Sequence, residues 1–229
     1  MINNSFSQFI ESLSSSFIPV VDSKFLNEEY TSIDLSIYNK NLDSIDVSSS
    51  MAFEDYISKY LITTRAKVAF GGYNETRGIY RRSKHFNQQD PETERNIHLG
   101  LDVWCDVGTD VLAPLTGKVH SFRNNKNFGD YGPTIILEHN IQEVIFYTLY
   151  GHLSKKSIEG IEIGQRFYGG DVIAQLGDAT VNGDYAPHLH FQIIRDLKGN
   201  IGDYPGVSNK KELQFFLQNC PDPNLLLKI

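Results

Sequence analysis

Two short segments of the chain each carry two side chains that could bind the same metal ion. In "HLGLD" a histidine and an aspartate, His98 and Asp102, stand four residues apart around Gly100. Side chains alternate between the two faces of a strand, so these three residues share one face if the segment is extended. Gly100 then leaves room for something held by the two flanking side chains.

A second pair lies in "APHLHFQII", where His188 and His190 would share one face of a strand. Neutral imidazole and carboxylate are ligands that suit zinc. His98, Asp102 and one histidine of this pair would make a three-ligand site whose fourth position is open to water, as in catalytic zinc sites. The segment "YGHL" adds His152 at the end of a strongly β-forming run.

The other histidines and the two cysteines fit structural roles better. We interpret His85, His120 and His139 as surface or strand-edge residues. Cys105 and Cys220 are far apart and no CxxC pair exists, so we expect buried free thiols rather than a disulfide or a cysteine-bound zinc. Since HExxH, GxSxG and Walker motifs are absent from the sequence, the histidine motifs carry the only enzyme signal.

Composition and charge narrow the classes of partner. The chain has 229 residues, 40% of them hydrophobic, and a formal net charge of −7. The negative charge argues against nucleic acid and anionic membrane surfaces as partners. No Lys or Arg precedes Lys24, and no apolar run approaches the ~20 residues that span a bilayer. We therefore expect a cytoplasmic protein without a membrane span, or a cell-envelope protein if a leader has been removed.

Three regions separate by pattern. Residues 1–70 predict a mainly helical extension, with helical spacing in "SFSQFIESL" and in the serine-capped "SSSMAFEDYISKYLITTRAKVAF", and a short strand in "TSIDLSI". Residues 71–207 predict the β-rich domain with the site, entered through a polar and exposed connection over 71–96. Residues 208–229 predict a closing helix, capped by Ser208 and ended by Pro221, and a tail that packs on the core.

The β-rich region consists of short apolar segments divided by Gly, Pro, Asn and Asp. This texture predicts many short strands in a sandwich or barrel-like sheet. The expected strands are "HLGLDVWC", "VLAPL", "GKVHSF", "PTIILEHN", "EVIFYTLYGHL", "DVIAQLG" and "HLHFQIIRD".

With these motifs assembled, the chain resembles the lysostaphin-type, or LytM-like, zinc metallopeptidases of bacterial cell-wall peptides. The matching elements run in the family's order over about residues 71–196: "HLGLD", "GTDVLAPLTGKV", "YGHL" and "PHLHF". The chain is most similar to a subgroup that is also found fused to class-III aminotransferases, through "GDYGPTIILEH", "FYTLYGHLS", "PHLHFQII", "GDYPGV" and "CPDPNLLL".

The resemblance implies an α+β fold whose mostly antiparallel β-sheet core is of the LytM type, the duplicated hybrid motif, with a helical N-terminal extension and a C-terminal helix. It makes His98, Asp102 and His190 the ligands of Zn²⁺. His152 and His188 become the catalytic histidines, one as acid and base and the other as oxyanion stabiliser, in an order that stays open. The implied activity is a zinc metalloendopeptidase that cleaves peptides or muropeptides next to glycine or D-alanine.

Two departures from the family pattern keep other functions open. Gln192 follows "HLHF" where many members have Glu, and the loop Gly177–Pro187 replaces a Gly/Ser-rich turn, a change that we expect to affect specificity more than zinc binding. One alternative is a binding or regulatory module that docks on a protein partner through the N-terminal extension. Another is a zinc hydrolase of a small cytoplasmic amide. An inhibitory segment is a further hypothesis, with Asn74 as the candidate for zinc's open position.

Overall fold

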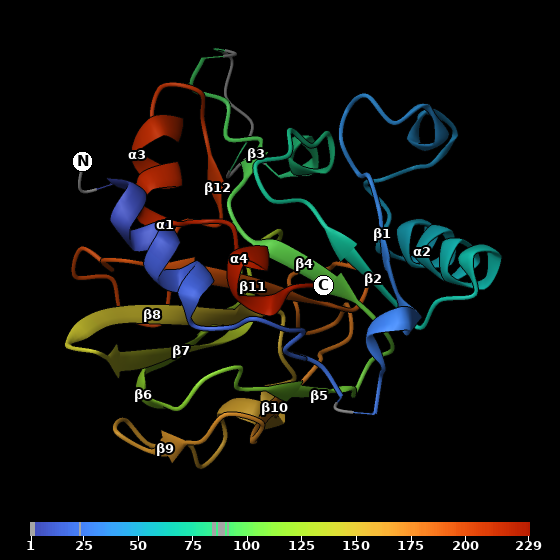
Figure 1. Ribbon diagram of the computed structural model, residues 1–229. Helices are drawn as coiled ribbons and strands as arrows, with labels where there is room; N and C mark the ends of the chain where they lie inside the picture. Colours follow the sequence, from blue (N-terminus) through green and yellow to red (C-terminus); the bar gives the residue numbers. More distant parts are fainter. Residues whose placement is uncertain (1–2, 23, 84–85, 87–89, 91) are drawn as a thin grey trace.

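A single eight-stranded sheet dominates the molecule (Figure 1). The computed structural model describes residues 3–22, 24–83, 86, 90 and 92–229. The strand order in this sheet is β1-β2-β4-β11-β8-β7-β6-β9, and two small sheets pair β10 with β5 and β12 with β3. Every pairing is antiparallel except β1 with β2. The expected α+β fold with a mostly antiparallel core and a C-terminal helix is confirmed.

The strands are short and the helices lie mainly toward the two ends of the chain. The strands are β1 Tyr30–Ser32, β2 Val68–Gly71, β3 Ile97–His98, β4 Leu101–Trp104, β5 Asp110–Leu112, β6 Gly117–Asn125, β7 Gly132–Ile141, β8 Val144–Gly151, β9 Arg166–Phe167, β10 Val172–Gln175, β11 His188–Ile194 and β12 Val207–Ser208. The α-helices are α1 Asn3–Ser12, α2 Ser50–Thr64, α3 Leu213–Asn219 and α4 Asn224–Leu227. Short 3-10 helices span Asn27–Glu29, Lys40–Ser44, Ile79–Arg82 and Lys155–Ile158. Within the described chain, no helix has both the length and the apolar character needed to cross a bilayer.

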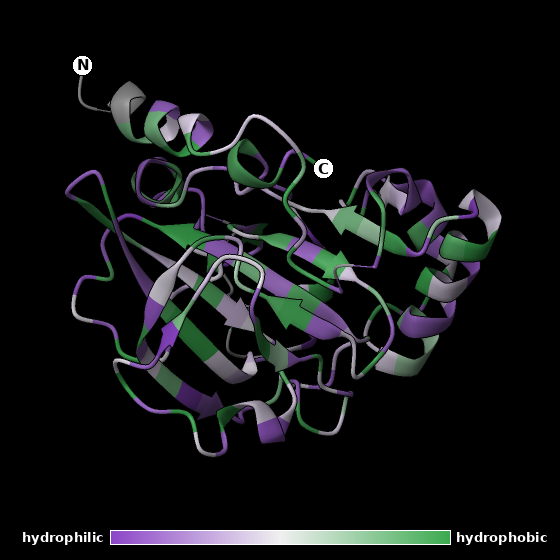
Figure 2. Ribbon diagram, turned by 60° about the horizontal axis from the view of Figure 1, so that its bottom comes forward, coloured by the Kyte–Doolittle hydropathy of each residue, from purple (hydrophilic) through white to green (hydrophobic). Residues whose placement is uncertain are grey.

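The two faces of β11 separate the core from the candidate site. Leu189, Phe191 and Ile193 are fully buried in the main hydrophobic cluster, as the alternation predicts. His188 and His190 point to the other face. Figure 2 shows hydrophobic stretches of the central strands alternating with more hydrophilic ones, as expected of strands with one face in the core and one face outside it. The core therefore holds the strand rigidly while its histidines face a pocket.

Residues 1–70, the N-terminal section, pack on this sheet at two places. Helix α1, predicted from its apolar spacing, lies beside α4, so the two ends of the chain cover the same side (Figure 1). The Ser49 side chain caps α2 by accepting from the backbone N–H of Ala52. That helix ends at Thr64, because Arg65 adopts a left-handed conformation. The chain then forms β2, which pairs with β4 beside the histidine motif.

Three secondary-structure predictions need correction. The strand expected in "TSIDLSI" lies earlier, at β1, where it pairs with β2. "HLGLDVWC" forms two strands rather than one, because the extended conformation is interrupted at Leu99 and Gly100. The first strand, β3, pairs with β12 and does not enter the main sheet. Ser208 belongs to β12 and does not cap α3, whose N-cap position is Glu212.

The structural roles given to the other histidines and cysteines are partly confirmed. Both cysteines are buried free thiols, as predicted. His120 is half-buried on β6. His139, however, is fully buried, and its ring bonds to the Thr116 carbonyl and the Thr148 hydroxyl, so its surface or edge assignment was wrong. His85 lies outside the described residues.

Candidate metal centre

Three side chains from three strands converge on one point. His98 ends β3, Asp102 lies on β4, and His190 lies on β11 directly opposite Asp102. The distance from His98 Nε2 to His190 Nδ1 is 2.9 Å, and Asp102 Oδ1 lies 3.2 Å from the first and 3.1 Å from the second. All three residues are at most 2% exposed. The predicted ligand set is therefore assembled in space even though β3 and β4 belong to different sheets.

The spacing of these three atoms fits a zinc ion. Zinc bound tetrahedrally at about 2.0–2.1 Å places its ligand atoms roughly 3.3 Å apart. The observed separations of 2.9 to 3.2 Å are close to that value. Two imidazoles and one carboxylate are also a donor set that zinc accepts with a fourth position open.

Hydrogen bonds at the far side of each imidazole fix which nitrogen faces the centre. His98 Nδ1 donates to the Gly72 carbonyl at 3.0 Å. His190 Nε2 donates to Gln192 Oε1 at 3.0 Å, and the Tyr131 hydroxyl lies 3.4 Å from the same nitrogen. His98 Nε2 and His190 Nδ1 are therefore left as lone-pair donors toward the centre. Gln192, noted as a departure from the family pattern, provides the acceptor that His190 needs.

A cation from the 71–96 connection meets the carboxylate. Arg77 Nη1 donates to Asp102 Oδ2 at 2.5 Å, with both side chains nearly fully buried. Burial by itself would raise the pKa of Asp102, but the neighbouring His98 ring and the Arg77 guanidinium hold that pKa well below its usual range. Burial lowers the pKa of His98 to about 4. At pH 7 both groups are in the forms that bind a metal.

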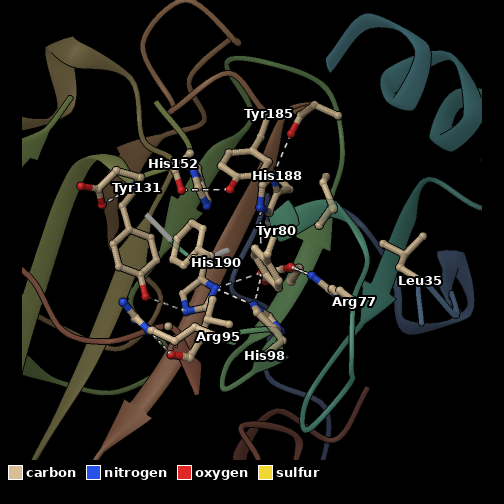
Figure 3. A pocket seen from close by; sticks show the side chains of 18 of the residues that line it. Leu35, Arg77, Tyr80, Arg95, His98, Tyr131, His152, Tyr185, His188 and His190 are labelled. Atoms are coloured by element: carbon tan, nitrogen blue, oxygen red, sulfur yellow. Dashed lines mark hydrogen bonds and ion pairs between the residues drawn. The ribbon is translucent and has the colours of Figure 1, made fainter. Parts of the chain in front are cut away.

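His152 and His188 lie side by side, next to His98 and His190 (Figure 3). Their ring centroids are 4.2 Å apart, and His188 Nε2 is 3.9 Å from Asp102 Oδ1. Each Nδ1 donates to a backbone carbonyl at 2.7 Å, that of Asn182 for His152 and that of Ala186 for His188. Burial lowers the pKa of both rings. Both are therefore neutral at pH 7, and each has an Nε2 lone pair that can accept a proton.

The loop before β11 has a larger role than the sequence suggested. Asn182 and Ala186, which orient the two histidines, both belong to the loop Gly177–Pro187. The Asn182 side chain is fully buried and donates to the carbonyls of Gly177 and Tyr185, which fixes the loop. The loop therefore orients the two candidate catalytic rings. That its departure from the family pattern affects specificity more than zinc binding stays a prediction.

Gly100 leaves space, as predicted, and the ring of His190 fills that space. A Cβ atom on Gly100 would lie 2.5 Å from His190 Cε1 and 2.6 Å from His190 Nε2. It would also lie 2.9 Å from the Phe191 carbonyl oxygen. The absence of a side chain at Gly100 thus makes room for the ring of His190, one of the candidate ligands.

A pocket of about 820 Å³ opens over the five site residues. The N-terminal section provides an apolar wall that includes Leu35, Ile37 and Phe53. Tyr80, from the 3-10 helix Ile79–Arg82, stacks with the His98 ring at a centroid distance of 6.5 Å. Further residues that line the pocket lie within the segments 123–127, 129–131, 185–190 and 200–207. The pocket is thus bounded by both the β domain and the N-terminal section.

The connection over 71–96 contributes other residues than the one proposed. Asn74 is exposed, does not line the pocket, and uses its backbone N–H to bond the His98 carbonyl, which contradicts its assignment as the residue at zinc's open position. Arg77 and Tyr80, buried in the same segment, reach the site instead. Neither was found by sequence reasoning, because the segment is polar and lacks periodicity. Tyr131 was also missed, whereas Gln192 could have been found from its place two residues after His190 on the same strand face.

Residues 96–202 match the model of peptidase family M23. The match covers a little under half of the 229 residues and includes His98, Asp102, His152, His188 and His190. It supports the assignment of this part of the chain to family M23. Arg77 and the apolar wall of the pocket lie outside the matched segment. No curated protein matches the chain significantly.

Several solved structures are similar to the β domain. One is the catalytic domain of the antimicrobial peptidase lysostaphin from Staphylococcus simulans, with 24% identity, 53% of this chain and 80% of that chain covered, and a TM-score of 0.35. Another is LytU, with 26% identity, 62% and 85% covered, and a TM-score of 0.36. The catalytic domain of the prophage-encoded M23 protein EnpA from Enterococcus faecalis has 17% identity, 54% and 83% covered, and a TM-score of 0.38. With TM-scores below 0.5, these similarities do not establish the activity of this chain.

Proposed function

We propose that the protein is a zinc-dependent endopeptidase that hydrolyses short peptide bonds, of the cell-wall type next to glycine or D-alanine by resemblance. The observation that carries the proposal is the convergence of His98, Asp102 and His190 at the spacing of zinc ligands, with His152 and His188 beside them. The family M23 match over residues 96–202 supports the same activity.

The hydrogen bonds of the site support a role for each of its side chains. His98 Nε2, Asp102 Oδ1 and His190 Nδ1 would hold the ion. When bound, zinc supplies a Lewis acid that polarises the scissile carbonyl and lowers the pKa of water to about 7. One of His152 and His188 accepts the proton of the attacking water at Nε2 and returns it to the leaving amine.

The second histidine is subject to a constraint that the geometry imposes. Since each Nδ1 already donates to a backbone carbonyl, a neutral ring has no N–H left to point at an oxyanion. Either ring becomes a donor at Nε2 only after it has been protonated. Oxyanion stabilisation by the second histidine therefore requires its imidazolium form. The carboxylate of Asp102 lies 3.9 Å from His188 Nε2 and favours this charged form at His188.

The burial of the site favours one alternative, a zinc hydrolase of a small amide. The five site residues are each at most 5% exposed, and residues 1–70 form one wall of the pocket. A volume of about 820 Å³ is within the range of roughly 300–1,000 Å³ that small-molecule sites occupy. A short peptide or a compact amide therefore fits this pocket better than a cross-linked polymer.

The decisive experiment compares substrates and tests the metal at the same time. The purified protein is incubated with muropeptides, with glycine-containing peptides and with small amides, in the presence of zinc and after chelation, and the products are read by mass spectrometry. Peptide cleavage that vanishes on chelation and returns with zinc is the expected result. Turnover of small amides alone would favour the alternative. Bound zinc, no hydrolysis and a tight protein partner would favour a binding module.

A further inference from the structure

A short segment outside the family-matched residues contacts two of the three metal ligands. The Gly72 carbonyl accepts from His98 Nδ1, and Arg77 Nη1 donates to Asp102 Oδ2. The same segment is tied to the strand that carries His98, since Asn74 N–H donates to the His98 carbonyl and His98 N–H donates to the Glu75 carbonyl. The metal centre is therefore supported from outside the matched domain.

Arg77 bonds only one of the two carboxylate oxygens of Asp102, and the other oxygen faces the histidine rings. Oδ1 lies 3.1 to 3.2 Å from the ring nitrogens of His98 and His190, whereas Oδ2 accepts from Arg77. Arg77 is only 4% exposed, and its guanidinium lies 5.5 Å from the centroid of the Trp104 ring. The cation is thus held in one place by packing as well as by charge.

A second carboxylate fixes the guanidinium from its other side. Glu75 Oε2 accepts from Arg77 Nε at 2.6 Å, and Glu75 Oε1 accepts from the backbone N–H of Leu35 at 3.0 Å. A continuous chain of bonds therefore runs from the N-terminal section through Glu75 and Arg77 to Asp102. Each link is at least half-buried, so water competes little for these bonds.

We propose that Arg77 is a positioning residue of the metal centre, which keeps Asp102 a one-oxygen ligand and ties the metal affinity to the N-terminal section. The inference rests on the zinc site of the proposed function. By occupying Oδ2, Arg77 prevents both carboxylate oxygens from binding the ion and leaves the fourth position to water or substrate. Arginine is suited to this task because its planar guanidinium can bond Asp102 and Glu75 at once, which an ammonium group cannot do in the same geometry.

The test measures metal binding rather than hydrolysis. Zinc affinity is measured by competition with a chromophoric chelator, and the visible spectrum is recorded with Co²⁺ in place of zinc. The variants are Arg77→Gln, Arg77→Lys and Glu75→Gln. The control is Arg166→Gln, which removes an exposed arginine on β9 far from the ligands in the strand order. The melting temperature of each metal-free variant shows that it is folded.

Loss of Arg77 should weaken zinc binding about 10- to 100-fold, the usual range when a partner of a metal ligand is removed. The Co²⁺ bands of Arg77→Gln should become weaker, because a second Asp102 oxygen raises the coordination number. Arg77→Lys and Glu75→Gln should fall between Arg77→Gln and the unmodified protein, and Arg166→Gln should match the unmodified protein.

Two different failures can be told apart. A folded Arg77→Gln with unchanged affinity and an unchanged Co²⁺ spectrum would overturn the role of Arg77 alone. If Arg77→Gln does not fold, unchanged values for Arg77→Lys would overturn it instead, since an ammonium group cannot reproduce the planar arrangement of both bonds. Absence of zinc binding by the unmodified protein would overturn the proposed function itself.

Discussion

Replacement of Gly100 by alanine should disrupt the metal centre with the smallest possible change of side chain. The new Cβ would lie 2.5 Å from His190 Cε1, whereas carbon atoms in contact prefer about 3.5–4.0 Å. The ring would have to move by roughly 1 Å to restore that contact. The new Cβ cannot move away toward β11 instead, because the Phe191 carbonyl oxygen on that strand is only 2.9 Å from it.

A displacement of this size is large for a metal ligand. Metal–ligand distances are defined to about 0.2 Å, so a shift of roughly 1 Å removes His190 Nδ1 from bonding distance. We expect zinc affinity to fall by at least about 100-fold, equivalent to about 3 kcal/mol. Chelator competition measures the affinity, and the melting temperature of the metal-free protein measures the cost to the fold.

Gly169→Ala is the matched control for this prediction. Its Cβ would meet nothing closer than the Pro114 carbonyl oxygen at 3.6 Å, an ordinary contact. Neither glycine has a positive φ, so backbone strain does not distinguish the two variants. If Gly100→Ala binds zinc as tightly as Gly169→Ala, the reasoning that Gly100 makes room for the His190 ring is refuted.

Three further predictions address the chemistry and the stability of the site. His152→Ala and His188→Ala should each lower kcat by about 10²- to 10⁴-fold while zinc stays bound, and unchanged turnover in either variant would reject the role assigned to that ring. Gln192→Leu should weaken zinc binding about 10- to 100-fold because His190 Nε2 loses its acceptor, whereas Gln192→Glu should keep the affinity. Chelator competition measures both affinities, and an equal loss in the two variants would contradict this role of Gln192. Burial lowers the pKa of His139 from 6.5 to about 4, so the unfolded chain takes up this proton first. As the pH drops from 6.5 to 4, His139 alone should therefore contribute a loss of about 3 kcal/mol in stability, seen as the difference in pH dependence between the unmodified protein and His139→Asn. Urea unfolding of the metal-free protein at several pH values measures this loss, and the same pH dependence in His139→Asn would contradict it.

The motif residues could be predicted from the sequence because strand alternation is a local property. His188 and His190 share a face wherever the segment is extended, and β11 is extended. Alternation alone could not choose between them as ligands. The choice depends on the register of β11 against β4, which places His190 opposite Asp102 and His188 opposite Trp104. Register is a property of two distant segments, so only the resemblance singled out His190 before the structure was known.

Arg77 could not be predicted for a related reason. The connection over 71–96 contains several arginines in a polar, turn-rich context, and no spacing distinguishes Arg77 from Arg81 or Arg82. What distinguishes it is the pairing of β2 with β4, which brings the following residues against Asp102. Such long-range pairings also account for the misplaced strand β1 and for the division of "HLGLDVWC" into β3 and β4.

The loop Gly177–Pro187 shows how a departure from a family pattern can preserve chemistry. The loop shares little with a Gly/Ser-rich turn in side chains, yet its hydrogen bonds to the two histidines are made by backbone carbonyls, those of Asn182 and Ala186. Any sequence that folds the loop in the same way can present these carbonyls to His152 and His188. The buried Asn182 side chain does this here by bonding Gly177 and Tyr185 within the loop itself. The other side chains of the loop are consequently free to differ while both histidines keep their orientation, so we expect changes in this loop to alter the shape of the pocket without reorienting the two rings.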